Sequence, residues 1–421
     1  MLKKISVDQL RLGMHVHSLE GKWIDHPFWK TRFLLDSSTD LARLQGSAVT
    51  ECWIDPAQGL DVAEAPPAAV LPPPQRPPVA AAPASAGTLA PPPVPVALNA
   101  PRTMAAELRE AAAICDRGRE AVLAMFGEAR MGRSIDADGC LDLVDDIASS
   151  ILRNPGALVS LARLKTRDDY SYMHSVAVCA LMVSLGRQIG MNEDECRAAG
   201  QAGLMHDIGK ALMPLEVLNK PGKLTEPEFA IIRGHPERGH RLLVEGQGAT
   251  PEMLDVVLNH HERVDGKGYP GRLPAERLSQ LARMGAICDV YDAITSNRPY
   301  KAGWDPAESI AQMASWKGQF DTVLFAAFVQ SLGIYPTGSL VKLASQRVAV
   351  VAEQNPGNLV APVVMAFYSS RSQLRIPPLR LDLAAPGCND RIVGRQTDDA
   401  GSFGNLDELW ADPEVLRRRA R

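Results

Sequence analysis

The chain has 421 residues, of which 46% are hydrophobic and 22% are charged, as expected for a soluble globular protein with two or three domains. The formal net charge of −4 argues against a general binder of DNA, RNA or anionic membranes, but allows a local basic pocket for a phosphate ligand. Seven cysteines without a CxxC pair indicate reduced thiols and a cytoplasmic location. The first residues lack the apolar run of a signal peptide, and we expect no membrane span.

Residues 1–62 predict a small α+β N-terminal domain. A helical turn is expected at residues 40–44, and turn signals at glycines separate short alternating runs that are typical of strands. These runs lie at residues 5–10, 14–19, 33–35 and 52–54. We expect the aromatic cluster of this domain to be packing core rather than a ligand pocket; it consists of Trp23, His26, Phe28, Trp29 and Phe33.

Residues 63–101 consist mainly of proline and alanine with almost no charge, which predicts an extended, semi-rigid linker. From residue 102 to residue 338 the pattern is helical, with helices expected at 103–126 and 141–152. Two further helix starts are marked by polar capping residues. They are Thr225 with Glu228, and Asp305-Pro306 with Glu308.

Residues 339–385 change to a strand-like pattern, which predicts a β-rich extension with a terminal hairpin. Its apolar runs lie at residues 340–343, 348–351 and 360–367. Residues 386–421 carry few apolar side chains and end in several arginines, so we expect a solvated tail. The predicted fold is therefore mainly α, a helical bundle with a C-terminal β-hairpin, preceded by a small α+β domain and a Pro/Ala-rich linker.

The histidines of the chain are clustered, since six of nine fall between His174 and His261. His206 and Asp207 follow an apolar helical run, and a buried carboxylate beside a buried imidazole is costly unless a partner such as a metal ion compensates it. Asp289 and Asp292 lie three residues apart on one face of a predicted helix at 281–294. Together these are the ligand types of a two-metal hydrolase. The candidate ligands are His174, His206, Asp207, His235, His260, His261 and Asp289.

The loop from His260 to Pro270 carries a second kind of signal. Gly266, Gly268 and Pro270 predict a tight turn that presents Tyr269 for packing beside a ligand, in preference to a plain surface turn. Cations near the predicted metals would suit a phosphate ester. These cations are Lys210, Arg298 and Lys301.

The motifs follow one another in the order His174, His206-Asp207-Ile-Gly-Lys210, His235-Pro236, His260-His-Glu-x-x-Asp-Gly-x-Gly-Tyr-Pro270, Asp289-x-x-Asp292-Ala and Arg298-Pro-Tyr-Lys301. Over roughly residues 160–335 this series resembles the HD-GYP family, a subgroup of the HD-domain metal phosphohydrolases, which implies a helical HD-type bundle. Residues 1–62 also look like the small domain often found ahead of HD-GYP domains in bacterial proteins.

The resemblance implies a cyclic di-GMP phosphodiesterase of bacterial second-messenger signalling, which opens the cyclic dinucleotide to linear pGpG and, in some members, continues to GMP. It implies two divalent ions, iron or manganese, between which a hydroxide attacks phosphorus. Imidazole and carboxylate ligands do not choose between these two metals. The substrate could also be another cyclic dinucleotide, because no residue visibly reads guanine edges.

The resemblance also implies a role for each residue. One ion would be held by His174, His206, Asp207 and Asp289, and a second by Asp207, His235, His260 and His261. Lys210 would assist catalysis beside Asp207. The substrate would contact Lys210, Tyr269, Pro270, Arg298 and Lys301. Asp292 would orient a ligand rather than bind metal.

One position departs from the family pattern. Some members carry a glutamate four residues before the first histidine that helps to hold a third metal, whereas Tyr170 stands there in this sequence. Asp168 and Asp169 are poorly placed to substitute for it, so we expect two metals. His240 is expected to be structural. Two alternatives stay open: a catalytically weak receptor, with a protein partner on the N-terminal domain or the Tyr269 loop, and a hydrolase for another nucleotide.

Overall fold

The computed structural model describes residues 2–19, 33–46, 49–61, 100–165, 170–220, 222–297, 303–398 and 403–419. Two compact units are present, Met1–Pro95 and Val96–Arg421. Nearly all of the predicted Pro/Ala-rich linker lies outside the described residues, as does the predicted aromatic cluster, of which only the backbone of Phe33 is described.

The first unit contains a four-stranded antiparallel sheet in the order β1-β4-β2-β3. The strands are β1 (Lys3–Ser6), β2 (His15–Leu19), β3 (Phe33–Leu34) and β4 (Glu51–Ile54), and the helix is α1 (Ser38–Gln45). Alternate strand residues such as Ile5, Val16 and Ile54 form its own small core, because successive side chains of a strand point to opposite faces. The predicted α+β domain is confirmed.

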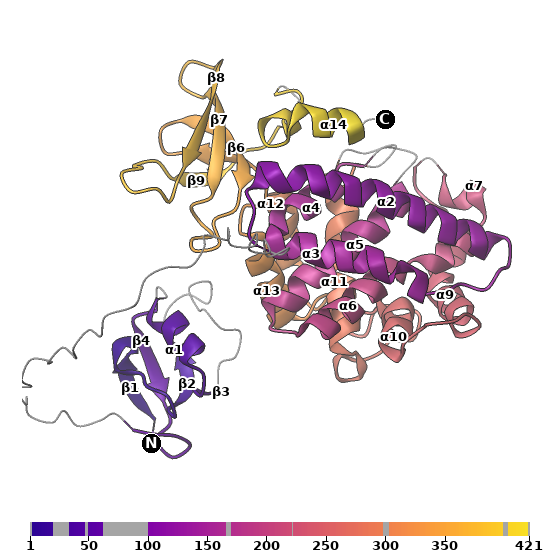
Figure 1. Ribbon diagram of the computed structural model, residues 1–421, viewed down its shortest axis with the longest axis horizontal. Helices are drawn as coiled ribbons and strands as arrows, with labels where there is room; N and C mark the ends of the chain where they lie inside the picture. The colour runs from indigo at the N-terminus through magenta and orange to yellow at the C-terminus, as the bar shows by residue number, and fades with distance from the viewer. Residues whose placement is uncertain are drawn as a thin grey trace, which may run out of the picture. The chain divides into compact units, whose positions relative to one another are not determined.

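The second unit is mainly helical (Figure 1). Its helices are α2 (Met104–Arg130), α3 (Leu141–Arg153), α4 (Pro155–Ala162), α5 (Tyr170–Gln188), α6 (Glu193–Met205), α7 (Leu215–Leu218), α8 (Glu226–Arg233), α9 (His235–Val244), α10 (Pro251–Asn259), α11 (Gln280–Thr295), α12 (Pro306–Ser315), α13 (Thr322–Leu332) and α14 (Pro413–Arg419). Helix α5 is buried on all sides from Met173 to Leu185 and packs against α6, α11, α2 and α4. A helix that is apolar all round is the one that a bundle buries at its centre.

The helix starts follow the predicted capping signals. Thr225 and Glu228 form the expected capping box of α8, and Asp305 accepts hydrogen bonds from the first backbone amides of α12. Between α2 and α3, the fully buried Glu107 carboxylate pairs with Arg153 at 2.6 Å and accepts a hydrogen bond from Ser150 at 2.8 Å. This pair joins the two helices in the interior.

The β-rich extension is larger than predicted. The expected hairpin pairing is present, since β6 (Arg347–Glu353) pairs with both of its chain neighbours, β5 (Leu340–Leu343) and β7 (Val363–Ser369). These strands belong to a five-stranded antiparallel sheet in the order β8-β7-β6-β5-β9. The other strands are β8 (Leu374–Asp382) and β9 (Ile392–Arg395). Isolated apolar runs predict strands one at a time and cannot show that β9 returns beside β5.

The prediction of a solvated tail over residues 386–421 is wrong. Strand β9 lies in this segment, and Phe403, Trp410 and Val415 are buried against the helical core. Helix α14 packs beside α2, and ion pairs join Arg418 to Asp116 and Arg109 to Asp412. A few well-spaced apolar side chains dock the segment, although its average composition is polar.

All seven cysteines are free thiols, as the sequence predicted. Among the helices that the structure describes, none is both long and apolar enough to cross a membrane.

Candidate metal centre

Five of the seven predicted ligands lie where helices of the second unit begin or end, and the other two, His174 and Asp289, lie within α5 and α11. His206 and Asp207 lie at the junction of α6 and a short 3₁₀ helix (Ile208–Leu212), and His235 opens α9. His260 and His261 follow α10. The backbones come unusually close at Gly209, where a Cβ atom would lie 2.0 Å from the His235 carbonyl oxygen. Glycine at this position lets Asp207 and His235 lie side by side.

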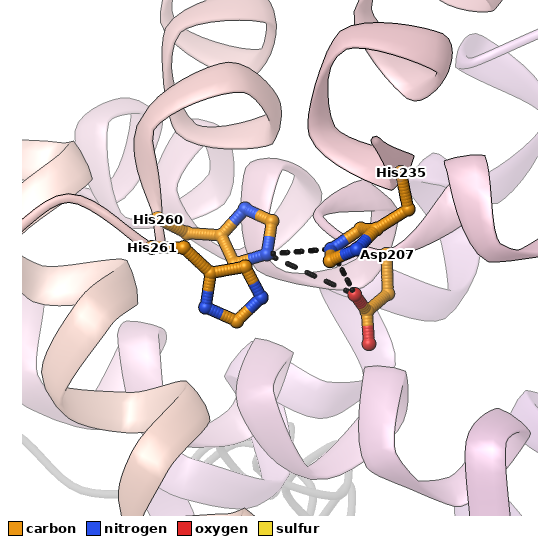
Figure 2. A group of neighbouring side chains, drawn as sticks. All are labelled: Asp207, His235, His260 and His261. Carbon is orange, nitrogen blue, oxygen red and sulfur yellow. Dashed lines mark hydrogen bonds and ion pairs between the residues drawn. The ribbon is translucent and has the colours of Figure 1, made fainter. Parts of the chain in front are cut away.

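Asp207, His235, His260 and His261 form the first group of potential metal ligands (Figure 2). The Oδ1 atom of Asp207 lies 3.1 Å from Nε2 of His235 and 3.8 Å from Nε2 of His260. The Nε2 atoms of His235 and His260 are 3.2 Å apart. All of these side chains are buried except His261, whose side chain is 20% exposed.

A second group shares Asp207 and adds His174 from α5 and His206. Here the other carboxylate oxygen, Oδ2, lies 3.4 Å from Nε2 of His174 and 3.3 Å from Nε2 of His206. The two Nε2 atoms are 3.2 Å apart. Asp207 therefore turns one oxygen toward each group, as a carboxylate that bridges two ions would.

The hydrogen bonds of the rings decide which nitrogen carries a lone pair. The Nδ1 atoms of His206 and His235 lie 2.7 Å from the carbonyls of Gly203 and Ile232, which can only accept, so Nδ1 donates in each ring. His260 does the same toward carbonyls of α10. When a metal ion takes the place of the second ring proton, the lone pair of each ring is therefore on Nε2, the atom that faces its neighbours across the centre.

This arrangement fits metal ions. Three Nε2 lone pairs and a carboxylate converge, and Oδ1 of Asp207 is buried without a hydrogen-bond partner among the described residues. Burial, together with the neighbouring histidines, holds the pKa of His260 well below its ordinary value, and burial lowers that of His261 to about 3. Neutral imidazoles and a carboxylate are the donor set that divalent transition metals take. The two groups could therefore hold metal ions.

Asp289, on α11, contacts both groups. Its Oδ1 atom lies 3.0 Å from Nε2 of His174, and its Oδ2 atom lies 3.5 Å from Nδ1 of His261. Burial by itself would raise the pKa of Asp289, but the hydrogen bond from His174 and the neighbouring histidines outweigh it and hold that pKa well below the usual range. A carboxylate anion at this point is ready to bind a cation.

Asp292 lies one helical turn further along α11 and faces the back of His174. Its Oδ2 atom accepts a hydrogen bond from Nδ1 of His174 at 2.6 Å, and its Oδ1 atom accepts one from Ser296 at 3.2 Å. The fully buried ammonium of Lys165 forms an ion pair with the same Oδ2. Sequence reasoning missed Lys165, because a single lysine after an apolar run gives no periodic signal.

Lys210 and the Tyr269 loop border the centre. Lys210 pairs with Oδ2 of Asp207, and although burial would raise the pKa of Asp207, this ammonium and His206 hold it well below the usual range. The ring of Tyr269 stacks on His261, with centroids 4.6 Å apart and an interplanar angle of 29°. Pro270 follows Tyr269 in the wall of a pocket.

Other predicted residues are placed elsewhere or are not described. Arg298, Lys301, Asp168 and Asp169 lie outside the described residues, and of Tyr170 only the backbone, at the start of α5, is described. His240 lies on α9 and belongs to neither ligand group.

Comparisons with known proteins identify the family. Residues 150–324 match the family described as HD domain, and residues 2–140 match a domain of unknown function, DUF3391. The chain is 53% identical over 412 residues, 97% of this chain and 96% of the relative, to cyclic di-GMP phosphodiesterase PA4108 of Pseudomonas aeruginosa.

Other relatives match a shorter part of the chain. Cyclic di-GMP phosphodiesterase response regulator RpfG of Xanthomonas campestris is 40% identical over 136 residues, 32% of this chain and 36% of that protein. The 3'3'-cGAMP-specific phosphodiesterase 1 of Vibrio cholerae is 35% identical over 169 residues, 39% of this chain and 38% of that protein. The chain belongs to the HD-GYP family of HD-domain phosphohydrolases. It is an enzyme, a phosphodiesterase of that family.

Proposed function

We propose that this chain hydrolyses cyclic di-GMP to linear pGpG in bacterial second-messenger signalling, and we leave open the second step to GMP that some members of the family perform. The observation that carries the proposal is the convergence of five histidines with Asp207 and Asp289 in one buried centre. The relative that is 53% identical along almost its whole length is named a cyclic di-GMP phosphodiesterase, which supports the same substrate here.

We propose two divalent ions, iron or manganese. One would be held by His174, His206, Asp207 and Asp289, and the other by Asp207, His235, His260 and His261. When bound, the ions would supply Lewis acidity and a nucleophilic water at neutral pH. Because Tyr170 stands where some relatives of the family carry glutamate, this chain lacks that ligand for a third ion.

The chain's own residues orient the ligands and the substrate. Asp292 fixes the ring of His174 through the bond to Nδ1, which turns Nε2 toward Asp289. The ammonium of Lys210 lies at the edge of the centre with its side chain 20% exposed, where it can neutralise charge that develops on the phosphate.

The remaining proposed contacts belong to the pocket side of the centre. The phenol of Tyr269 stays neutral, because burial raises its pKa far above the physiological range, and it can pack against the substrate while donating a hydrogen bond. Arg298 and Lys301 would contact the phosphates, and Pro270 would line the pocket. We also propose a cytoplasmic protein that uses its N-terminal domain or the Tyr269 loop to contact a protein partner.

Turnover of cyclic di-GMP by the full chain, purified anaerobically and loaded with iron or manganese, tests the proposal. Linear pGpG should be formed by the parent, with about two metals per chain, and should disappear in Asp207→Asn. Asp194→Ala is the matched control, because Asp194 is an exposed carboxylate at the start of α6, and it should retain activity. Tight nucleotide binding with full metal loading and no product would favour a receptor, and turnover of 3'3'-cGAMP alone would reassign the substrate.

A further inference from the structure

A pocket of about 610 Å³ lies between α8, the start of α9 and the Tyr269 loop, which is a size typical of small-ligand sites. Its walls carry three cationic side chains, Arg233, Lys267 and Arg272, and a single carboxylate, Glu237. None of these four residues was singled out by sequence reasoning, because they are scattered over 40 residues and follow no motif of their own. The pocket has an excess of positive charge.

The two arginines of this pocket are available to bind an anionic ligand. Among the described residues, neither Arg233 nor Arg272 forms an ion pair, and both are exposed. Lys267 has only a long ion pair with Asp265, at 3.8 Å, and its side chain is 77% exposed. Guanidinium groups bind phosphate through two parallel N–H donors, so such a pair of arginines suits a phosphodiester.

The backbone of Arg272 is strained where it meets the pocket. Its φ angle is 50°, in the left-handed region that glycine adopts readily and other residues adopt at a cost. The buried carboxylate of Glu262 holds this conformation by accepting hydrogen bonds from the amides on either side, Gly271 at 2.6 Å and Leu273 at 3.2 Å. These two hydrogen bonds fix the backbone that carries the guanidinium of Arg272 at the pocket wall.

The pocket adjoins the metal centre through one aromatic ring. Tyr269 lines the pocket and also stacks on His261, one of the proposed ligands. The guanidinium carbon of Arg233 lies 5.5 Å from the centroid of the Tyr269 ring and 4.4 Å from that of Phe229. Tyr269 therefore borders both the metal centre and the pocket whose walls carry Arg233 and Arg272.

We propose that this pocket binds the second phosphodiester of the cyclic dinucleotide, the one that is not being cleaved, through Arg233 and Arg272 with Lys267 at the rim. The inference rests on the proposed function, since a cyclic dinucleotide carries two phosphodiesters and the metal centre engages only one of them. It makes Arg233 and Arg272 specificity residues that distinguish a cyclic dinucleotide from a simple phosphodiester.

The test compares two substrates in the metal-loaded full chain, cyclic di-GMP and bis(p-nitrophenyl) phosphate, which has a single phosphodiester. Arg272→Gly removes the side chain while allowing the same backbone conformation, so its melting temperature should be at least that of the parent. Loss of a charged hydrogen bond should lower kcat/KM for cyclic di-GMP at least about tenfold more than for bis(p-nitrophenyl) phosphate. Arg233→Ala should act in the same way, and the exposed Arg277→Ala is the control that changes neither value.

Equal losses on both substrates, or no loss on either, would overturn the pocket assignment. Calorimetric titration with cyclic di-GMP gives a second readout, in which Arg272→Gly should weaken binding about tenfold and an unchanged Kd would again overturn it. A parent that cleaves bis(p-nitrophenyl) phosphate but no cyclic dinucleotide refutes the proposed function instead. The two failures are distinguishable, because one is read from the parent and the other from the variants.

Discussion

Replacing Lys165 by methionine should destabilise the helical unit strongly. The ammonium of Lys165 is fully buried and the side chain of Asp292 is only 3% exposed, so the substitution leaves a carboxylate in the interior without its cation. The hydrogen bonds from His174 and Ser296 remain. Although burial by itself would lower the pKa of His174, its hydrogen bonds to Asp289 and Asp292 raise it, so this imidazole offsets part of the lost charge. Breaking a buried pair from one side costs roughly 3–5 kcal/mol. For a unit that runs from Val96 to Arg421, an unfolding entropy of about 2.1 cal/mol/K per residue converts this loss to a fall in melting temperature of about 4–7 °C.

The assay is thermal and urea unfolding of the metal-free chain, with Lys165→Met, Asp292→Asn and the double variant in one cycle. Because the double variant removes both charges, it should be destabilised by less than the sum of the two single variants. The loosened ring of His174 should also weaken manganese binding about 10–100-fold, as is typical when a partner of a ligand is lost. Two results would refute the reasoning that Lys165 holds Asp292 and that Asp292 in turn orients His174. One is that the free-energy losses of the two single variants simply add in the double variant, and the other is that Lys165→Met binds manganese as tightly as the parent.

Three further predictions concern other parts of the chain. Glu107→Ala leaves the guanidinium of Arg153, whose side chain is only 9% exposed, without its carboxylate partner. Urea unfolding should therefore show a loss of roughly 3 kcal/mol, the lower end for a buried pair, and an unchanged midpoint would contradict the pairing. Thiol titration at pH 8 should modify Cys388 first, because the other six thiols are buried. Burial raises the pKa of Cys52, for example, to about 11, which lowers its thiolate fraction. Rapid reaction of several thiols in the native chain would contradict this prediction. Gly268→Ala places a Cβ atom 2.4 Å from Cα of Glu262, so the Tyr269 loop must move. Phosphodiesterase activity should then fall roughly 100-fold, whereas full activity would show that the position of this loop does not matter for catalysis.

The sequence by itself determined the features that local signals encode. Capping residues such as Thr225 and Asp305 begin helices where predicted, because a cap needs only amides within the next turn. The order and type of the motif residues indicated the family, and spacing placed Asp289 and Asp292 on one helix face. The strand pattern also predicted a hairpin in the C-terminal region, since a hairpin pairs neighbours in the sequence, but it did not identify which strands pair.

Only the tertiary structure decided which distant residues meet. Lys165 and Asp292 are 127 positions apart, and no local pattern predicts that the segment after α4 will bring Lys165 to Asp292 on α11. The strained φ angle of Arg272 depends on the Glu262 carboxylate, nine and eleven residues from the amides that it binds. The docking of α14 on α2 likewise depends on a surface formed by the folded bundle. Periodicity and caps act over a few residues, whereas these contacts exist only once the helices have packed.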